Sequence, residues 1–359
     1  MLTHEHARRL VERGHRVALF VGAVEGQPGK ENIDGVDVIR SGGPVTTRFH
    51  AFRWYRAQQE EGHFDVVVEE INTLPYFAPW FAGAPVVLWM HQLAREVWWY
   101  EAPRPLAAVG FVLERSYLRL YAKKPALVLS ASTRQGLLEL GFDADRVQIV
   151  PPAIGSDDAR ADLPEKEDGL LVYVGRITPS KRVDHLVEAL AQVRGSGLDA
   201  RLEIVGGGEP AAQAAVERVA RGLGVEGHVR FSGYVDEHAK RDLLARAALI
   251  VMASAREGWG LAVTEANSVG TPAVVYDRPG LRDSTIHGRT GLLTSPNPQA
   301  LAAGITRALT EPDLYERLQA GALEWSREFT WERASSRFER ALLQAVEASG
   351  RSDPSGAKR

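Results

Sequence analysis

The chain has 359 residues, of which 45% are hydrophobic and 25% charged, a length and composition typical of a globular protein with two domains. Its formal net charge of -3 gives no general electrostatic reason to expect nucleic acid as a partner, and the lack of cysteine excludes disulfides, thiolate catalysis and cysteine-bound metals. No run of apolar residues approaches the ~18 needed to span a membrane, and the opening MLTHEHARRL has no apolar signal-peptide core. We therefore expect a cytoplasmic protein, at the inner face of the membrane if its substrate is lipid-linked.

Short apolar runs predict the strands of a first domain, since strands buried on both faces read as continuous hydrophobic segments. These runs are 16–22, 64–70, 85–91 and 126–132. A fifth run, 147–155, contains a double proline, which cannot continue a strand or a helix.

A polar linker rich in Asp and Glu, 156–168, marks the predicted domain boundary. After it, the predicted strands are 169–176, 200–208, 228–235, 249–254 and 272–277, and the predicted helices are 183–194, 210–223, 236–247 and 331–347. Two successive series of this kind predict an α/β fold of two doubly wound, Rossmann-like domains that face each other across a cleft. Ligands of such sheets bind beyond the carboxyl ends of the strands.

The strongest chemical pattern is EGWGLAVTE, residues 257–265. Glu257 and Glu265 lie eight positions apart, with glycines and a predicted strand-to-helix turn between them. Free amide groups at a helix start suit a phosphate or sugar hydroxyls, and Glu265, one turn into the helix, can accept hydrogen bonds from a ribose. Two glutamates at this spacing also arise by chance on charged helices, but the full string, followed by Gly-Thr-Pro at 270–272, is far more specific.

This string resembles the E-x7-E signature of the family-4 retaining glycosyltransferases, also called glycosyl transferases group 1, with Trp259 in place of the usual phenylalanine. In that family the first glutamate contacts the donor sugar and the second holds the ribose, which implies these roles for Glu257 and Glu265. The same loop implies donor contacts at Gly258, Trp259, Gly260 and Leu261.

The resemblance covers nearly the whole chain and implies a GT-B fold in three parts. Residues 1–155 correspond to an acceptor-side domain, 165–330 to the nucleotide-sugar-binding domain, and 331–348 to a helix that crosses back onto the N-terminal domain. Apolar residues at helical spacing in that helix include Phe338 and Leu342, which we expect to pack on the N-terminal domain.

The second pattern is VGRITPSKRVDHLVEAL, residues 174–190. After a strand, Gly175 lets the chain turn, and Arg176 and Lys181 can bracket a diphosphate, arginine as a planar fork and lysine as a point charge. Such a pair is ordinarily two solvated loop charges, but its position after the domain's first strand favours a site. The string also resembles the family's Gly-Arg-x4-Lys element, which binds the donor pyrophosphate, and this implies that Arg176 and Lys181 stabilise the leaving group.

Three further candidates depend on weaker signals. Gly207 lies in a Gly-Gly-Gly run after a predicted strand, and Val235 ends another; in the family these regions lie near the nucleotide base. His91 ends the predicted strand 85–91, and the resemblance implies contact with the donor sugar or the acceptor. A structural role for a lone histidine stays open as the alternative.

No metal or cofactor is expected, since the nucleotide sugar is a substrate and two fixed cations can neutralise its diphosphate. Asp143 and Asp145 match the D-x-D metal motif of a different glycosyltransferase fold, but turn formation explains them adequately.

The start of the chain departs from the family pattern, which begins with a strand and a glycine-rich loop. This chain begins inside the helix that follows, HEHARRLVERGHRVALF. In a doubly wound sheet the missing strand is central, so its neighbours are left with unpaired backbone groups. We expect a true start upstream, with a shortened chain or pairing of the remaining strands across the gap as alternatives.

Together these patterns and the family resemblance predict a metal-independent hexosyltransferase that moves a sugar from a UDP- or GDP-linked donor to a hydroxyl acceptor, in the synthesis of a glycan, a glycolipid or a glycosylated metabolite. The resemblance implies that the transfer retains the anomeric configuration. The expected route is attack on the same face of the sugar, with Glu257 as a covalent nucleophile as the minority alternative. A dehydrogenase lacks its Gly-x-Gly-x-x-Gly signature here, whereas a sugar-nucleotide epimerase and a non-catalytic nucleotide-sugar-binding relative stay open.

The acceptor is not readable from the sequence. Trp98, Trp99 and Tyr100, near Lys123 and Lys124, suit peripheral contact with a lipid-linked acceptor at a membrane. They equally suit a core or a cleft wall, which is the more ordinary interpretation.

Overall fold

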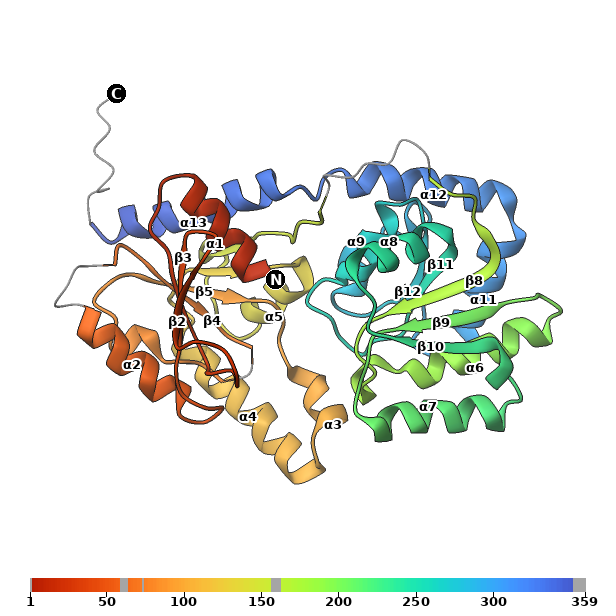
Figure 1. Ribbon diagram of the computed structural model, residues 1–359, viewed down its shortest axis with the longest axis horizontal. Helices are drawn as coiled ribbons and strands as arrows, with labels where there is room; N and C mark the ends of the chain where they lie inside the picture. Colours follow the sequence, from red (N-terminus) through yellow and green to blue (C-terminus); the bar gives the residue numbers. More distant parts are fainter. Residues whose placement is uncertain (1, 59–63, 73, 156–162, 351–359) are drawn as a thin grey trace.

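A computed structural model describes residues 2–58, 64–72, 74–155 and 163–350, which form two lobes side by side (Figure 1). Within these residues, no helix is both long and apolar enough to cross a bilayer.

The first lobe contains two small sheets. One has the order β1-β3-β2, with β1 (Ala18–Val21) parallel to β3 (Val36–Arg40) and β2 (Lys30–Ile33) antiparallel to it. The other is fully parallel, in the order β4 (Val67–Glu70), β5 (Val86–Met90), β6 (Ala126–Val128) and β7 (Val147–Ile149). The helices of this lobe are α1 (Leu2–Glu12), α2 (Thr47–Gln58), α3 (Trp98–Glu101), α4 (Arg104–Leu120) and α5 (Ala131–Leu138).

Pairing across the gap between the two sheets, one of the alternatives above, does not occur among the described strands: β1 and β4 belong to separate sheets. Apolar side chains of α1 lie beside the second sheet instead. Leu2 and Leu10 share a buried cluster with Val87 and Trp89 of β5. The free energy gained by burying these side chains offsets part of the cost of leaving backbone groups unpaired at the facing edges of the two sheets.

The second lobe has one six-stranded parallel sheet in the order β10-β9-β8-β11-β12-β13. Its strands are β8 (Glu167–Val174), β9 (Arg201–Val205), β10 (Val229–Gly233), β11 (Ala247–Met252), β12 (Ala273–Tyr276) and β13 (Gly291–Thr294). Its helices are α6 (Val183–Gly195), α7 (Pro210–Gly222), α8 (Glu237–Arg246), α9 (Leu261–Asn267), α10 (Leu281–Ser284), α11 (Pro298–Thr310) and α12 (Pro312–Ser326).

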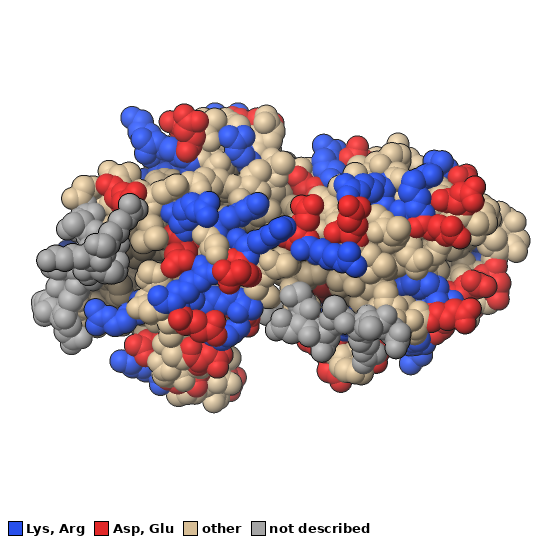
Figure 2. Space-filling model, turned by 90° about the horizontal axis from the view of Figure 1, so that it is seen from above, with Lys and Arg blue, Asp and Glu red and all other residues tan. Residues whose placement is uncertain are grey.

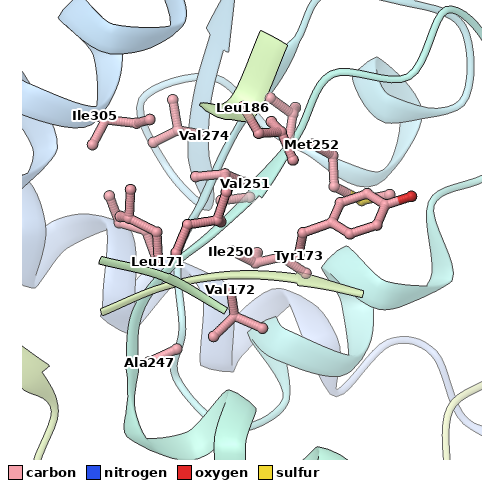
Figure 3. Packing of buried hydrophobic residues seen from close by; sticks show 14 of the residues in the cluster. Leu171, Val172, Tyr173, Leu186, Ala247, Ile250, Val251, Met252, Val274 and Ile305 are labelled. Atoms are coloured by element: carbon pink, nitrogen blue, oxygen red, sulfur yellow. The ribbon is translucent and has the colours of Figure 1, made fainter. Parts of the chain in front are cut away.

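Helices cover both faces of this sheet, with α6, α7 and α11 on one face and α8, α9 and α12 on the other (Figure 1). Aliphatic side chains of the central strands fill the interior, where Leu171 and Val172 of β8 lie beside Ile250 and Val251 of β11 (Figure 3). Side chains buried on both faces explain why these strands read as unbroken apolar runs.

The last helix, α13 (Trp331–Ala348), crosses from the second lobe back to the first, as predicted (Figure 1). The ring of Phe338 lies 4.8 Å from that of Trp89, centroid to centroid, and Leu342 belongs to the same cluster. Arg13, just after α1, donates a hydrogen bond of 2.5 Å to Glu339 of α13. The chain is therefore a two-lobed α/β protein whose lobes are joined at the linker and by α13.

Candidate active site

The loop after β8 carries the two predicted cations. Arg176 is exposed, and its backbone oxygen accepts a 2.7 Å hydrogen bond from the Tyr173 hydroxyl. Gly175 leaves no room for a side chain, because an added Cβ would lie 2.8 Å from that hydroxyl. Lys181 ends a short 3₁₀ turn, Pro179–Lys181, immediately before α6. The carboxyl end of β8 therefore presents both cations from one short loop.

Lys181 contacts the second motif directly. Its Nζ lies 2.6 Å from Oε1 of Glu257, and the Ser254 hydroxyl donates a 2.7 Å hydrogen bond to the same oxygen. The two side chains are only 16% and 13% exposed, so this pair is shielded from solvent and its attraction is stronger than that of a surface ion pair. Residues 76 positions apart in the chain are thus brought together where β8 and β11 end.

The glycines after Glu257 allow close backbone packing. A Cβ on Gly258 would lie 2.3 Å from the backbone oxygen of His91, in the other lobe. Gly260 has φ 96°, a left-handed conformation that favours glycine, and it precedes the first residue of α9, Leu261. The segment between the two glutamates therefore lies where the lobes meet.

Trp259 is turned away from this loop. Its side chain is 6% exposed, its Nε1 donates a 2.8 Å hydrogen bond to Thr264, and its ring lies 5.2 Å from Phe329. Leu261 packs against the same buried cluster. A bound donor can therefore reach Trp259 only through its backbone, and the tryptophan-for-phenylalanine difference is a change in the core.

Glu265 pairs with a lysine that sequence reasoning missed. Lys240 of α8 places its Nζ 3.1 Å from Oε2 of Glu265 and 2.8 Å from Glu237. Burial alone would lower the pKa of Lys240, but the two carboxylates outweigh it and the pKa is raised. In the sequence this lysine looks like any charge on a polar helix, so no motif marks it.

The ends of β9 and β10 lie beside the Arg176 loop. Ile177 donates a 2.9 Å backbone hydrogen bond to Gly207. A Cβ on Gly207 would lie 2.6 Å from the ring of Tyr234, whose side chain is 81% exposed. Val235 follows and packs partly against the core. Gly207 and Val235 thus share the sheet edge that carries Arg176, and the exposed aromatic ring of Tyr234 lies against Gly207.

One segment of the first lobe contacts both loops of the second. The backbone N–H of Ser180 donates a 3.2 Å hydrogen bond to Glu101, at the end of α3, and Glu96 lies 3.0 Å from Arg256. Burial would raise the pKa of Glu101, but hydrogen bonds from Ser180 and the nearby charge of Arg176 lower it, so this carboxyl is ionised near neutral pH. Residues 96–101 therefore hold the two lobes together around the site.

His91 lies at the end of β5, with its backbone against Gly258. Its Nε2 is buried without a hydrogen-bond partner among the described residues and lies 3.8 Å from Glu70. Burial lowers the pKa of His91 although Glu70 opposes this shift, so the ring is neutral near pH 7. The imidazole contacts Glu70 and Trp89 of its own lobe.

Asp184, His185 and Glu188 form a group whose ligand atoms lie close enough together to hold a metal ion. Arg182, however, pairs with Asp184 at 2.9 Å and contacts the His185 ring, while the other ring nitrogen contacts the Tyr276 hydroxyl at 2.7 Å. Arg182 therefore already occupies the Asp184 carboxylate and one ring nitrogen of His185 in this group. Asp143, in turn, accepts a 3.2 Å hydrogen bond from the backbone of Asp145, which is the turn role predicted for it.

Two family models match the chain, one for each lobe. Residues 156–325 match the family model described as glycosyl transferases group 1, and residues 1–158 match that of glycosyltransferase family 4. A D-inositol 3-phosphate glycosyltransferase of Geodermatophilus obscurus is 31% identical, over 96% of this chain and 84% of that protein. A GDP-mannose-dependent alpha-(1-6)-phosphatidylinositol dimannoside mannosyltransferase of Mycobacterium tuberculosis is 34% identical, over 46% of this chain and 42% of that protein.

Solved structures share the architecture. Sucrose-phosphate synthase from Thermosynechococcus elongatus is similar over 96% of this chain and 93% of that chain, with a TM-score of 0.81 and 21% identity. Anabaena HepE in complex with UDP and glucose is similar over 96% of this chain and 95% of that chain, with a TM-score of 0.72 and 18% identity. At these identities the similarity concerns the fold, which is the GT-B arrangement of two Rossmann-like domains.

Proposed function

The chain belongs to the glycosyl transferases group 1 and is a glycosyltransferase, and we propose that it transfers a sugar, with retention of anomeric configuration, from a UDP- or GDP-linked donor to a hydroxyl acceptor. The observation that carries this proposal is the 2.6 Å contact between Lys181 and Glu257, which joins the two motif loops at one sheet edge. HepE, similar in fold, is solved with UDP and glucose, and the mycobacterial relative is named for GDP-mannose. A nucleoside diphosphate sugar is the donor class that both names share.

The second lobe holds the donor. Arg176 and Lys181 face the diphosphate and stabilise the negative charge that develops on it as the glycosidic bond breaks. Glu265 accepts hydrogen bonds from the ribose hydroxyls, and Gly175, Gly207 and Val235 line the sheet edge toward the base. The backbone of Gly258 and Gly260 lies close to the sugar, and the Glu257 side chain lies beside the same sugar.

Transfer proceeds on the same face of the sugar through an oxocarbenium-like transition state. The acceptor hydroxyl attacks the anomeric carbon, the bond to the diphosphate breaks, and a phosphate oxygen of the leaving group takes the acceptor proton. Glu257 is a poor covalent nucleophile because one of its oxygens is engaged by both Lys181 and Ser254. Its role is to hold Lys181 and to contact the sugar.

The first lobe supplies the acceptor side. The named relatives differ here, one acting on D-inositol 3-phosphate and the other on phosphatidylinositol dimannoside, so the shared class is a hydroxyl on a phosphate-bearing acceptor. His91, whose Nε2 is buried without a hydrogen-bond partner among the described residues, would hydrogen-bond the donor sugar or the acceptor once the lobes separate. The lobes must separate to admit the donor, because Glu96 and Glu101 hold them in contact around the site.

A screen of nucleotide sugars for release of UDP or GDP tests the proposal. We expect one donor to be hydrolysed slowly alone and faster when a hydroxyl acceptor is added. Consumption of donor at the same rate without acceptor, with a new nucleotide sugar as product, indicates an epimerase. Tight donor binding with no turnover in any combination indicates a non-catalytic protein, and either result refutes the transferase reaction proposed here.

Chelation is expected to leave the rate unchanged. Two cationic side chains neutralise the diphosphate, so transfer in EDTA should match transfer in added Mg²⁺ within about twofold. The measurement is the initial rate of nucleotide release in both buffers after dialysis against chelator. A rate that falls on chelation and returns with Mg²⁺ indicates metal-dependent chemistry.

Replacing Glu265 with alanine is expected to weaken donor binding. Hydrogen bonds to a charged group contribute about 1.5–3 kcal/mol, so the donor KM should rise about tenfold to a hundredfold, with a smaller change in kcat. Glu237→Ala is the matched control, because Glu237 also pairs with Lys240 but is largely exposed. Equal KM values for the two variants argue against a ribose contact at Glu265.

A further inference from the structure

The outer face of α4 exposes an apolar stripe. Its five aliphatic side chains, each more than half exposed, are Leu106, Val109, Val112, Leu113 and Leu120. Their spacing of three, four and seven residues places them on one side of the helix. A helix of a globular protein normally turns such a stripe toward the core, but α4 packs inward with other residues, among them Ala107, Tyr117 and Leu118.

The exposed charged side chains beside this stripe are all positive. Arg104, Arg115 and Arg119 are exposed on the same helix, and Lys123 follows it. The acid of this helix, Glu114, is buried and accepts hydrogen bonds of 2.6 and 2.7 Å from the backbone of residues 94 and 95. The side of α4 that faces solvent is therefore apolar and cationic.

Two exposed aromatic side chains, Phe77 and Trp80, lie near the buried Tyr121 ring that follows α4. The ring of Tyr121 lies 5.4 Å from that of Trp80, which is more than half exposed, and Phe77 lies 5.6 Å from Trp80. Arg48 of α2 donates hydrogen bonds to the backbone of the same loop, at Leu74 and Pro75. Helix α2 carries three arginines and no acid, and Figure 1 shows α2 and α4 on the same side of the first lobe.

The opposite side of the molecule differs. Figure 2, which views the face over α1 and α13, shows Lys and Arg intermingled with Asp and Glu. Ion pairs account for some of these charges, such as Arg8 with Glu5 at 3.0 Å and Arg13 with Glu339 at 2.5 Å. On α2 and α4, by contrast, the exposed charged side chains are all arginines, and they lie next to exposed apolar side chains.

We propose that this surface, defined by the apolar stripe and arginines of α4 with Phe77 and Trp80, binds an anionic lipid bilayer. Helices that lie in a membrane interface combine an apolar face with basic flanks, and their binding grows with buried apolar area and with attraction to anionic lipid. A second copy of the chain fits less well, because a two-fold contact places the arginines of one copy against those of the other.

Helix α4 lies near the donor site, so binding of a bilayer to it affects which acceptor the site can reach. This step rests on the transferase function proposed above. Helix α4 begins three residues after Glu101, whose carboxylate contacts Ser180 in the Arg176–Lys181 loop. A bilayer against α4 therefore lies next to the donor site, so the acceptor is a hydroxyl displayed at a lipid surface. Trp99 and Tyr100 belong to α3 between these two features and are partly exposed, and the Trp99 ring lies 6.2 Å from that of Phe111 of α4.

Flotation of the full chain with vesicles tests the binding. Vesicles of phosphatidylcholine alone are compared with vesicles of equal parts phosphatidylcholine and phosphatidylglycerol, at physiological salt. We expect the chain to float with the anionic vesicles and to stay behind with the neutral ones. Leu113→Asp and the pair Arg115→Glu with Arg119→Glu should each lower the bound fraction about tenfold, because the first introduces a charge in the stripe and the second reverses the attraction.

The matched control reverses two exposed arginines of α13, Arg333→Glu with Arg340→Glu, and should bind as the unaltered chain does. Donor hydrolysis in solution, measured on every variant, checks the fold and is independent of vesicle binding. No binding to anionic vesicles, or equal loss in the α13 control, overturns the proposal; so does a soluble dimer that the α4 changes dissociate. Vesicle binding without any donor turnover would leave the membrane surface standing and refute the catalytic function alone.

Discussion

Replacing Lys181 with alanine is expected to lower kcat about a hundredfold to a thousandfold, the cost of removing one preorganised group that stabilises charge in a transition state. The ammonium is fixed by its 2.6 Å contact with Glu257 before any donor binds, so it needs no rearrangement when the diphosphate departs. The variant loses this stabilisation of the leaving group and leaves Glu257 without its cation. Steady-state kinetics with a single donor give kcat and KM separately.

Two further variants show whether the effect belongs to this loop: Arg176→Ala removes its other cation, and Arg230→Ala is the control. Arg176 is exposed, so its removal changes charge without leaving a buried group unpaired, and kcat should again fall about a hundredfold. Arg230, in the same lobe, has a side chain that is 78% exposed, and its removal should leave the rate unchanged. Near-normal turnover in both Lys181→Ala and Arg176→Ala would refute leaving-group stabilisation by this loop.

The second large effect is expected for Glu257→Gln, with kcat lowered about a hundredfold or more. The amide keeps the shape of the side chain but removes the negative charge that fixes Lys181, so a part-buried ammonium loses its partner. Ser254→Ala serves as the control, because it removes a neutral donor to the same oxygen and should cost less than about tenfold. Circular dichroism spectra and thermal unfolding of both variants report whether the fold survives.

The same residue separates the two chemical routes. Same-face attack leaves no covalent sugar on the enzyme, so the intact mass of the unaltered chain should not change after brief incubation with donor alone. A mass increase of one sugar residue that Glu257→Gln abolishes would instead establish Glu257 as the nucleophile.

Much of the second lobe follows from the sequence because its strands are buried on both faces and its turns carry glycine. The helix predicted for 183–194 is Val183–Gly195, and the strand predicted for 169–176 is Glu167–Val174. The strand predicted for 126–132 ends earlier, at Val128. Ser130 caps α5 by accepting a hydrogen bond from the backbone of Thr133, and this local capping ends the strand.

The first lobe was less predictable. The hairpin of β2 and β3 turns at Asp34 and Gly35, both with positive φ, and an Asp-Gly pair between short runs is a known hairpin signal. Strand β2 (KENI) is short and polar, and β3 (VDVIR) alternates buried valines with an exposed aspartate, so neither strand is an unbroken apolar run. The separation of the lobe into two sheets depends on which strand edges meet in space, which local patterns do not encode.

Within the site, the sequence identifies charges that sit in motifs but not the partners that hold them. Arg176, Lys181, Glu257 and Glu265 stand out because glycines and strand ends surround them. Lys240 lies in an ordinary charged helix, and its contact with Glu265 exists only once α8 and α9 pack together. Trp259 looks like a ligand contact because it lies within the motif, but its own ring is buried against Phe329.

A crystal structure of the chain with UDP or GDP, whichever it binds more tightly, tests the central claim most directly. We expect the diphosphate within hydrogen-bond distance of Arg176 and Lys181, with the ribose hydroxyls on Glu265. A nucleotide bound elsewhere, with these side chains unoccupied, would contradict the account.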